Sequence, residues 1–451
     1  MPSAPCVPDI RDNWRVQQGK RPRFSLDCPR LKEDAMSEAR TTFPEKGMSW
    51  DVIEPLMTQM AGGDEQWRDG RVPLYVFKAT DEAYDVGRDA YFKFFAENAL
   101  GGKRAFHSIG RMEREVVDMA LDLFQAPEGA GGGMTTGGTE SIFMAVRACR
   151  EWAREAKGRQ GPFNIVAAES AHPAFDKAGV TMDIPVKRIP LRDDFRADPA
   201  AMAAAIDDDT MMMVGSAPCF PHGVIDDIST LSPVAEETGV WLHVDACVGG
   251  YLTPFVKRLG REVPDFDFAI PGVRSISADL HKFGFAPKPS STVLYWSEED
   301  FQRQVFDLDP WTYGRMTTST LVGTRPAGGI AGSWAVFKHL GIDGYTKVAR
   351  DLMEMVDGYV AGIEAIDGLK MHAKPDLTII NFGSDEVDIF RVAEVMAESE
   401  WVPGMTQRPK GLHAMLSMLH APAREDYLAD LAKAVEKTRL SDEKSTISAT
   451  Y

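Results

Sequence analysis

Short apolar runs alternate with helical segments through the middle of the chain, and this alternation narrows the possible folds more than any other feature. The runs are Asn164–Ala168, Met211–Ser216, Val240–Ala246 and Thr292–Trp296, and the helical segments between them include Pro199–Ile206 and Ser229–Glu237. Strands that are buried on both faces have such continuous apolar sequences, because helices cover both sides of a parallel sheet. The alternation therefore predicts an α/β domain built on a mainly parallel sheet.

The segments before this domain differ in character. Residues 1–45 are rich in Pro, Arg, Lys and Asp and show little periodicity, which predicts either an extended arm or a disordered segment. Apolar positions at helical spacing predict helices over Trp50–Met60, Tyr84–Leu100 and Met112–Phe124. A loop rich in Gly and Thr over 129–141 then leads into a further helix.

Beyond Arg325 the pattern changes to a mixture of helices and short strands. The predicted helices are Ile330–Leu340, Gly344–Ile363, Val387–Glu400 and Arg424–Lys437, and the predicted strands are Leu377–Phe382 and His413–Leu419. This mixture indicates a small α+β domain. The predicted organisation is an N-terminal arm and helical segment over 1–110, a large domain over 111–335 and a small C-terminal domain over 336–451.

Charge and cysteine content exclude several classes of function. The 451 residues include 67 acidic and 50 basic side chains, and the net charge of −17 argues against nucleic acid or an anionic membrane surface as the main partner. No uninterrupted apolar stretch of about 18 residues occurs, so no membrane span is expected. The five cysteines are widely spaced and include no C-x-x-C pair, which predicts reduced thiols and no metal site. Because the first residues lack the apolar core of a signal peptide, we expect a cytoplasmic location.

Lys282 lies in the apolar context SISADLHKFG (275–284). A lone lysine after a strand is most often a solvated surface residue. Here His281 precedes it and Phe283 follows it, so we expect the amine to be desolvated. Desolvation lowers the pKa of a lysine, and the neutral amine is a nucleophile that can form a Schiff base.

Asp245 closes the apolar run in WLHVDACVGG (241–250). One interpretation is a cap for the next helix. The other is a partner for a protonated ring nitrogen, because a buried carboxylate without a cationic partner is costly. A strand-end aspartate followed 37 residues later by a lysine is the arrangement that pyridoxal 5′-phosphate requires. The lysine holds the C4′ carbon of the cofactor, and the aspartate keeps the pyridinium protonated so that the ring accepts electrons.

Two further features belong with this pair. In TTGGTES (135–141), Gly138 lets the backbone approach an anion, and Thr139 and the first helical amides can donate to it at the positive end of a helix dipole. His172 follows the Asn164–Ala168 run; a lone histidine is more often structural, but one at the end of a strand can stack on an aromatic cofactor. The four features in this order are far more specific than any one of them.

The series of motifs resembles the sphingosine-1-phosphate lyase branch of the pyridoxal-phosphate group II decarboxylase family. The matching segments are FPEKG (43–47), WRDGRV (67–72), TTGGTES, SAHPAFDK (170–177), APCFPHGVIDDI (217–228), HVDACVGG, SISADLHKFGFAPK (275–288), GTRPAGG (323–329) and DIFRVAEVM (388–396). The resemblance covers almost the whole chain. It implies the type I (aspartate aminotransferase-like) fold and a homodimer whose active sites are each built from two chains.

The resemblance also implies roles for individual residues. Lys282 matches the lysine that carries the cofactor, Asp245 matches the partner of the pyridine nitrogen, and His172 matches the histidine that stacks on the ring. The matched phosphate contacts are Gly138, Thr139 and His281, together with Gly323 and Thr324, which are expected to reach the cofactor of the other subunit. From its Ala-Pro-Lys-Pro context (286–289), one interpretation of Lys288 is a solvated loop lysine; the resemblance instead matches it with a lysine that binds the substrate's phosphate in the lyases.

Three positions depart from the family pattern. The N-P-L-H motif of the family is replaced by Asn98-Ala99-Leu100-Gly101, and two of its tyrosines are replaced by Phe77 and Met316. Because these groups lie near the substrate in the family, we expect a small anionic amine rather than sphingosine 1-phosphate as the substrate.

The leading hypothesis for the reaction is carbon–carbon cleavage of a β-hydroxy amine, a retro-aldol reaction that yields an aldehyde. The alternative is α-decarboxylation of an amino acid, and a remote third possibility is a non-catalytic scaffold that keeps the fold.

Overall fold

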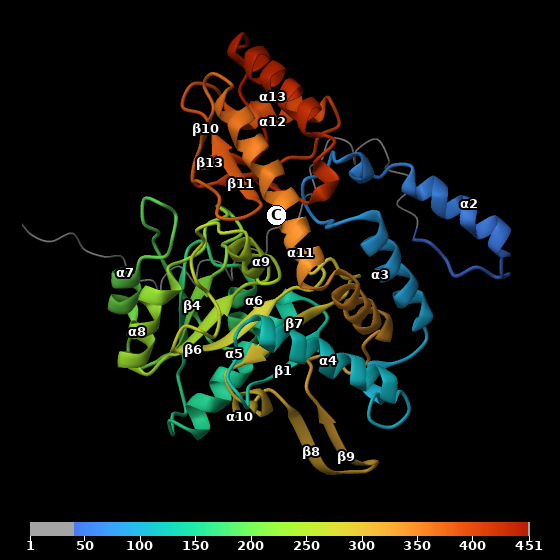
Figure 1. Ribbon diagram of the computed structural model, residues 1–451, viewed down its shortest axis with the longest axis vertical. Helices are drawn as coiled ribbons and strands as arrows, with labels where there is room; N and C mark the ends of the chain where they lie inside the picture. The colour runs from blue at the N-terminus through green and yellow to red at the C-terminus, as the bar shows by residue number, and fades with distance from the viewer. Residues whose placement is uncertain (1–39, 450–451) are drawn as a thin grey trace, which may run out of the picture. The chain divides into compact units, whose positions relative to one another are not determined.

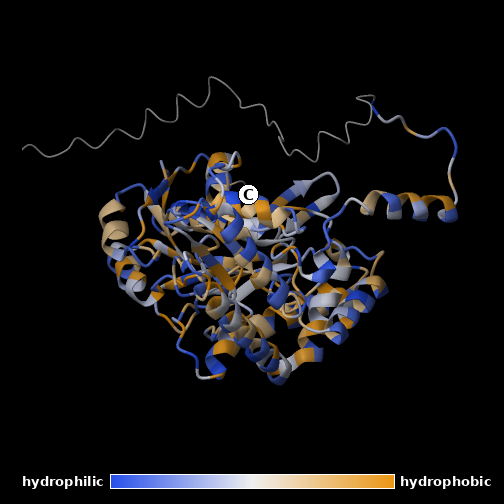
Figure 2. Ribbon diagram, turned by 90° about the horizontal axis from the view of Figure 1, so that it is seen from above, coloured by the Kyte–Doolittle hydropathy of each residue, from blue (hydrophilic) through white to orange (hydrophobic). Residues whose placement is uncertain are grey.

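The computed structural model describes residues 40–449 and divides into two compact units, one ending at Asp64 and one beginning at Glu65 (Figure 1). The described part of the first unit contains helix α2 (Trp50–Ala61), which carries Pro55 and alternates hydrophobic with hydrophilic residues (Figure 2). This helix confirms the one predicted over Trp50–Met60. The arm predicted over 1–45 lies mostly outside the described residues.

A seven-stranded sheet forms the centre of the second unit, with the strand order β1-β7-β6-β5-β4-β2-β3. Its strands are β1 (Gly131–Thr135), β2 (Asn164–Ala168), β3 (Val186–Ile189), β4 (Thr210–Ser216), β5 (Trp241–Asp245), β6 (Val273–Ala278) and β7 (Ser291–Tyr295). All pairings from β6 to β3 are parallel, whereas β7 runs antiparallel to both of its neighbours. The predicted mainly parallel sheet is therefore confirmed.

Both faces of this sheet are covered, which explains the continuous apolar runs. Along β2, Ile165 and Ala167 pack into one hydrophobic cluster, and Val166 and Ala168 pack into another. Successive side chains of a strand point to opposite faces. A strand between two cores therefore needs an apolar residue at every position rather than at every second one.

Helices surround the sheet in Figure 1. They are α3 (Asp81–Lys93), α4 (His107–Leu123), α5 (Gly138–Glu155), α6 (Ala174–Met182), α7 (Pro199–Ala205), α8 (Ile228–Thr238), α9 (Thr253–Arg258), α10 (Glu298–Gln302) and α11 (Ala327–Glu364). Helix α11 is kinked at Gly341, between the two helical stretches predicted there. The boundary predicted at 335/336 falls inside α11, and the three domain limits stay predictions. None of the helices in the described part of the chain combines the length and apolarity needed to cross a membrane.

The C-terminal region contains a second sheet of four strands in the order β10-β11-β13-β12. Its elements are β10 (Lys370–Met371), β11 (Ile379–Gly383), α12 (Ile389–Ala397), β12 (Gly404–Gln407), β13 (Lys410–Met415) and α13 (Arg424–Arg439). These elements confirm the predicted α+β character. The hairpin of β8 (Phe306–Trp311) and β9 (Gly314–Thr318), which projects from the body in Figure 1, was not predicted.

Residues 71–78 lie against this C-terminal region, although the two segments are far apart in the sequence. The backbone N–H of Val402 donates to the Arg71 carbonyl at 3.0 Å, and that of Met415 donates to the Pro73 carbonyl at 2.8 Å. These bonds fix the segment that carries Tyr75.

Two sequence predictions were wrong in detail. The loop predicted over 129–141 contains β1, whose glycines hide the strand pattern. A Cβ on Gly132 would lie 2.6 Å from the Leu294 side chain, so the close approach of β7 requires glycine there. The helix predicted over Tyr84–Leu100 begins earlier, where the Thr80 side chain accepts a hydrogen bond from the first turn, and ends at Lys93.

Candidate active site

The carboxyl ends of the parallel strands bring the predicted residues together. Asp245 is the last residue of β5, while His172 and Lys282 each lie four residues beyond the ends of β2 and β6. In open α/β sheets this edge is the usual location of a ligand site. Here it holds two adjoining cavities of about 200 and 430 Å³, which share six lining residues: His172, Asp245, Cys247, His281, Lys282 and Lys288.

Lys282 forms an ion pair that the sequence analysis did not predict. Its Nζ lies 3.0 Å from Oδ2 of Asp279, a carboxylate that is 3% exposed. Burial lowers the pKa of Lys282, but attraction by Asp279 outweighs burial, and the net pKa is raised above its ordinary value. The prediction that desolvation leaves this lysine with a lowered pKa is therefore wrong for the free enzyme. Burial alone would lower this pKa, and the charge of Asp279 reverses the direction.

Asp245 is buried and held in one orientation. Its Oδ1 accepts hydrogen bonds from the Cys247 backbone N–H at 3.1 Å and from the Ser277 hydroxyl at 3.2 Å. Its Oδ2 receives no hydrogen bond from any residue between 40 and 449 that the structure describes. This second oxygen is available for a donor in the cavities that Asp245 lines.

Two histidines border the same cavities. The Ala174 backbone N–H donates to Nδ1 of His172 at 3.2 Å, and burial lowers the pKa of this ring, so His172 is neutral near pH 7. His281 donates from Nδ1 to the Ser290 carbonyl at 2.5 Å. Burial also lowers the pKa of His281, despite the opposing attraction of Asp279.

The Gly/Thr loop contributes a cradle at the start of α5. A Cβ on Gly138 would lie 2.7 Å from the Cys247 sulfur and 3.0 Å from both Asp279 oxygens, so only glycine fits. Gly138 and Thr139 line the larger cavity at the positive end of the α5 dipole. This arrangement suits an anion such as a phosphate group.

Lys288 also lies in the cavity wall. Its Nζ donates to the Tyr75 carbonyl at 2.8 Å and sits 5.8 Å from the centre of the Phe77 ring. Burial, and then the charge of Lys282, lower the pKa of Lys288. Among the described residues, Lys282 and Lys288 are the two lysines that line these cavities.

The remaining predicted residues lie elsewhere. Gly323 and Thr324 are exposed and do not line the described cavities of their own chain. Of the three departures from the family pattern, Phe77 lines the smaller cavity, whereas Gly101 and Met316 do not line either cavity.

Sequence reasoning missed four residues of the site. They are Asp279, Cys247, Tyr75 and Glu140, all of which line one of the two cavities. Asp279 could have been found, because an acidic residue three positions before a buried lysine is a natural ion-pair partner. Tyr75 gave no signal, because its position depends on backbone contacts with a distant part of the chain.

Comparison with known proteins identifies the family. The pyridoxal-dependent decarboxylase conserved domain matches residues 106–384. The sphingosine-1-phosphate lyase of Oryza sativa subsp. japonica is 40% identical over 411 residues, which cover 89% of this chain and 76% of that protein. The chain belongs to the pyridoxal-dependent decarboxylase family.

Solved structures of other proteins agree with the family assignment. The structure of sphingosine-1-phosphate lyase from Burkholderia pseudomallei K96243 matches with a TM-score of 0.84 and 36% identity, covering 89% of this chain and 94% of that one. Glutamate decarboxylase of Lactobacillus brevis CGMCC 1306 shares the fold, with a TM-score of 0.78 at 19% identity over 90% of this chain and 97% of that one. The protein is thus a pyridoxal-phosphate-dependent lyase with the type I fold.

The cavity fits this cofactor. Gly138 and Thr139 form a cradle for its phosphate, and the Oδ2 of Asp245 can accept the proton of its ring nitrogen. The Lys282 amine lines both cavities and can reach a bound aldehyde.

Proposed function

We propose that this pyridoxal-dependent decarboxylase family member cleaves a carbon–carbon bond of a small anionic β-hydroxy amine and releases an aldehyde. The observation that carries the proposal is the placement of Lys288 in the same cavity as Lys282, Asp245 and His172. The named activity of the rice and Burkholderia relatives, at 36–40% identity, supports lyase chemistry on a phosphorylated amine.

Each of these residues has a distinct role in the proposed reaction. The cofactor, when bound, withdraws electrons from the bond that breaks. Asp245 holds the ring-nitrogen proton that makes this withdrawal effective, and His172 packs on the ring as a neutral side chain. Lys282 binds the cofactor and then accepts or donates a proton at the reacting carbon. Lys288 pairs with the anionic group of the substrate.

The lining of the cavity favours a substrate other than sphingosine 1-phosphate. Phe77, which lines the smaller cavity, cannot donate the hydrogen bond that a tyrosine would. Each missing charge-assisted hydrogen bond costs about 1.5–3 kcal/mol, or one to two decades in binding. We therefore propose weak or no cleavage of sphingosine 1-phosphate and efficient cleavage of a smaller anionic amine.

The cofactor assignment is tested by substituting Lys282. The purified enzyme should show the visible absorbance of lysine-bound pyridoxal phosphate, and Lys282→Ala should lack that absorbance. Absorption spectra of both proteins at equal cofactor loading provide the measurement. An unchanged spectrum in Lys282→Ala would contradict the assignment.

The substrate is tested by incubating the enzyme with β-hydroxy amines of increasing chain length, each with a phosphate or carboxylate group, and identifying the products. We expect an aldehyde without CO₂, and turnover that falls for the long-chain phosphate. Release of CO₂ without aldehyde would instead indicate amino-acid decarboxylation. Efficient turnover of sphingosine 1-phosphate would contradict the proposal that Phe77 disfavours this substrate.

Two further proposals concern the assembly and its location. A homodimer is supported by the exposure of Gly323 and Thr324, which match phosphate contacts of the family yet lie outside the described cavities of their own chain. A stable active monomer in analytical ultracentrifugation would contradict it. The cytoplasmic location stays a prediction from the sequence.

A further inference from the structure

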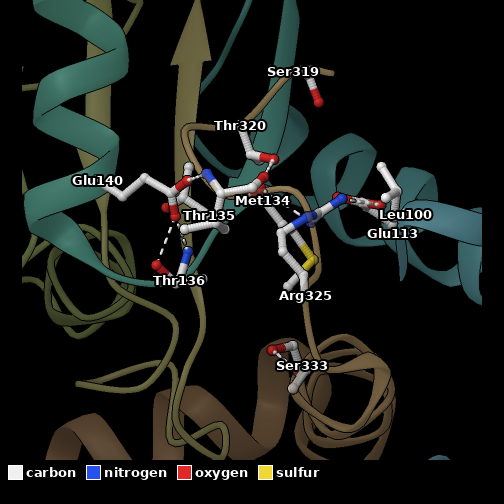
Figure 3. A network of polar contacts seen from close by, with 12 residues as sticks. Leu100, Glu113, Met134, Thr135, Thr136, Glu140, Ser319, Thr320, Arg325 and Ser333 are labelled. Carbon is white, nitrogen blue, oxygen red and sulfur yellow. Dashed lines mark hydrogen bonds and ion pairs between the residues drawn. The ribbon is translucent and has the colours of Figure 1, made fainter. Parts of the chain in front are cut away.

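Glu140 is a buried carboxylate that holds two separate backbone segments. It is 7% exposed. Its Oε2 accepts hydrogen bonds from the backbone N–H of Thr136 at 2.7 Å and from the Thr136 hydroxyl at 2.6 Å (Figure 3). Its Oε1 accepts from the backbone N–H groups of Leu321 at 2.8 Å and Val322 at 3.3 Å. The Glu140 side chain thus accepts hydrogen bonds from all four donors.

A helix cap explains only half of this arrangement. Glu140 is the third residue of α5, and a glutamate there commonly bonds back to the residues just before the helix. That role accounts for the bonds to Thr136. It does not account for the bonds to Leu321 and Val322, which lie 181 and 182 residues away in the sequence. These two bonds tie the phosphate cradle to a distant segment.

The segment held in this way, residues 321–324, presents free hydrogen-bond donors to the outside. All four residues are exposed, and a Cβ on Gly323 would meet no atom within 4 Å. In the part of the chain that the structure describes, no acceptor is found for the backbone N–H groups of Gly323 and Thr324. Exposed, unpaired amides next to a glycine can bind an anion that comes from outside the chain.

Further contacts make this segment rigid on its other side. The Asn98 side chain donates to the Thr324 hydroxyl at 3.2 Å. The Arg325 guanidinium pairs with Glu113 at 2.5 Å and donates to the Met134 carbonyl at 3.2 Å (Figure 3). Residues 321–324 are therefore held at both ends, from Glu140 before Gly323 and from Asn98 and Arg325 after it.

We propose that Glu140 is a positioning residue that couples two cofactor sites. It orders the cradle for the phosphate bound by its own subunit. At the same time it orders the Gly323 and Thr324 amides that bind the phosphate of the partner's cofactor. This inference rests on the proposed homodimer, and it adds a fixed link between the two phosphate sites.

The first test compares two cofactor forms. Glu140→Gln keeps one acceptor oxygen and loses the other, so it cannot hold both segments. We expect the dissociation constant for pyridoxal 5′-phosphate to rise about tenfold, with little change for pyridoxal, which lacks the phosphate. The matched control is Glu151→Gln on the same helix, where the carboxylate pairs only with Arg150 and Arg154 among the described residues. Equal losses for both cofactor forms would overturn the proposal, because a merely structural cap would act on both.

The second test uses hybrid dimers in which one subunit carries Lys282→Ala. The visible absorbance of lysine-bound cofactor then reports only the site of the other, unaltered subunit. Adding Glu140→Gln to the Lys282→Ala subunit should weaken cofactor affinity at that unaltered site. Unchanged affinity would overturn the coupling between sites. A wild-type enzyme that binds no cofactor would contradict the proposed function itself, and this outcome is distinct from both results.

Discussion

At the scale of single residues, the ion pair of Lys282 and Asp279 controls how readily the enzyme takes up its cofactor. The Asp279 carboxylate raises the pKa of Lys282 and so holds a proton on the amine. Attack on an aldehyde requires the neutral amine. The free enzyme is therefore stable with a protonated lysine and must lose that proton when the cofactor arrives.

Asp279→Asn should ease this step. The substitution removes the attractive charge but leaves the burial that lowers the pKa of Lys282, so a larger fraction of the amine is neutral at a given pH. We expect the rate of cofactor attachment to reach its plateau at lower pH than in the wild-type enzyme. Stopped-flow absorbance after mixing apoenzyme with pyridoxal phosphate at a series of pH values measures this rate. The control is Asp357→Asn, which removes a carboxylate from an exposed ion pair with Arg261. An unchanged pH profile in Asp279→Asn would contradict the explanation.

The sequence was sufficient to predict residues whose position follows from a single strand. Asp245, His172 and Lys282 each follow an apolar run, and the carboxyl ends of parallel strands share one edge. Tyr75 could not be predicted in this way, because backbone contacts with a distant part of the chain place it. The raised pKa of Lys282 was missed because its direction depends on the distance to one carboxylate rather than on residue type.

At the scale of secondary-structure elements, the sequence predicts strands that are apolar along their whole length and misses strands that are rich in glycine or carry charges. The boundaries of β2 match the prediction because both of its faces are apolar. Strand β1 has the sequence GGGMT, and its glycines leave room for β7 rather than marking a loop. The β3 strand was missed because it is only partly buried and carries Lys187 and Arg188.

Helix α11 offers a prediction at this scale. Gly341 has φ 56° and ψ −172°, a backbone conformation essentially restricted to glycine. We expect Gly341→Ala to lower the free energy of unfolding by about 1–3 kcal/mol. Gly344→Ala, in the helical part that follows, is the control and should not incur this backbone cost. Urea denaturation followed by circular dichroism compares the two variants, and equal stability of both would show that the kink tolerates a side chain.

At the scale of the whole molecule, buried histidines should make the fold sensitive to acid. Burial lowers the pKa of His222, His243 and His413 to about 4 in each case. In the unfolded chain a histidine titrates near 6.5. Between these two values the unfolded state binds more protons than the folded state, so stability falls as the pH decreases through this range.

A buried carboxylate acts in the opposite direction but does not cancel the effect. Burial raises the pKa of Asp226 to about 6, so between about pH 6 and 4 the folded state takes up this proton first. Because three histidines lower the stability on acidification and one aspartate raises it, the net effect of these four groups is a loss of stability. Urea midpoints measured at pH 7, 6 and 5 should decrease in that order. A midpoint that stays constant would show that the histidines are protonated without loss of the fold.

The contacts of residues 71–78 have a consequence for how the protein is made. This segment leaves the ribosome long before its backbone partners Val402 and Met415, which lie far along the chain. Until they emerge, the wall of the cavity that carries Tyr75 lacks these two backbone hydrogen bonds. The nascent chain can thus assemble its central sheet before the cavity wall that carries Tyr75 is held in place by its late-synthesised partners.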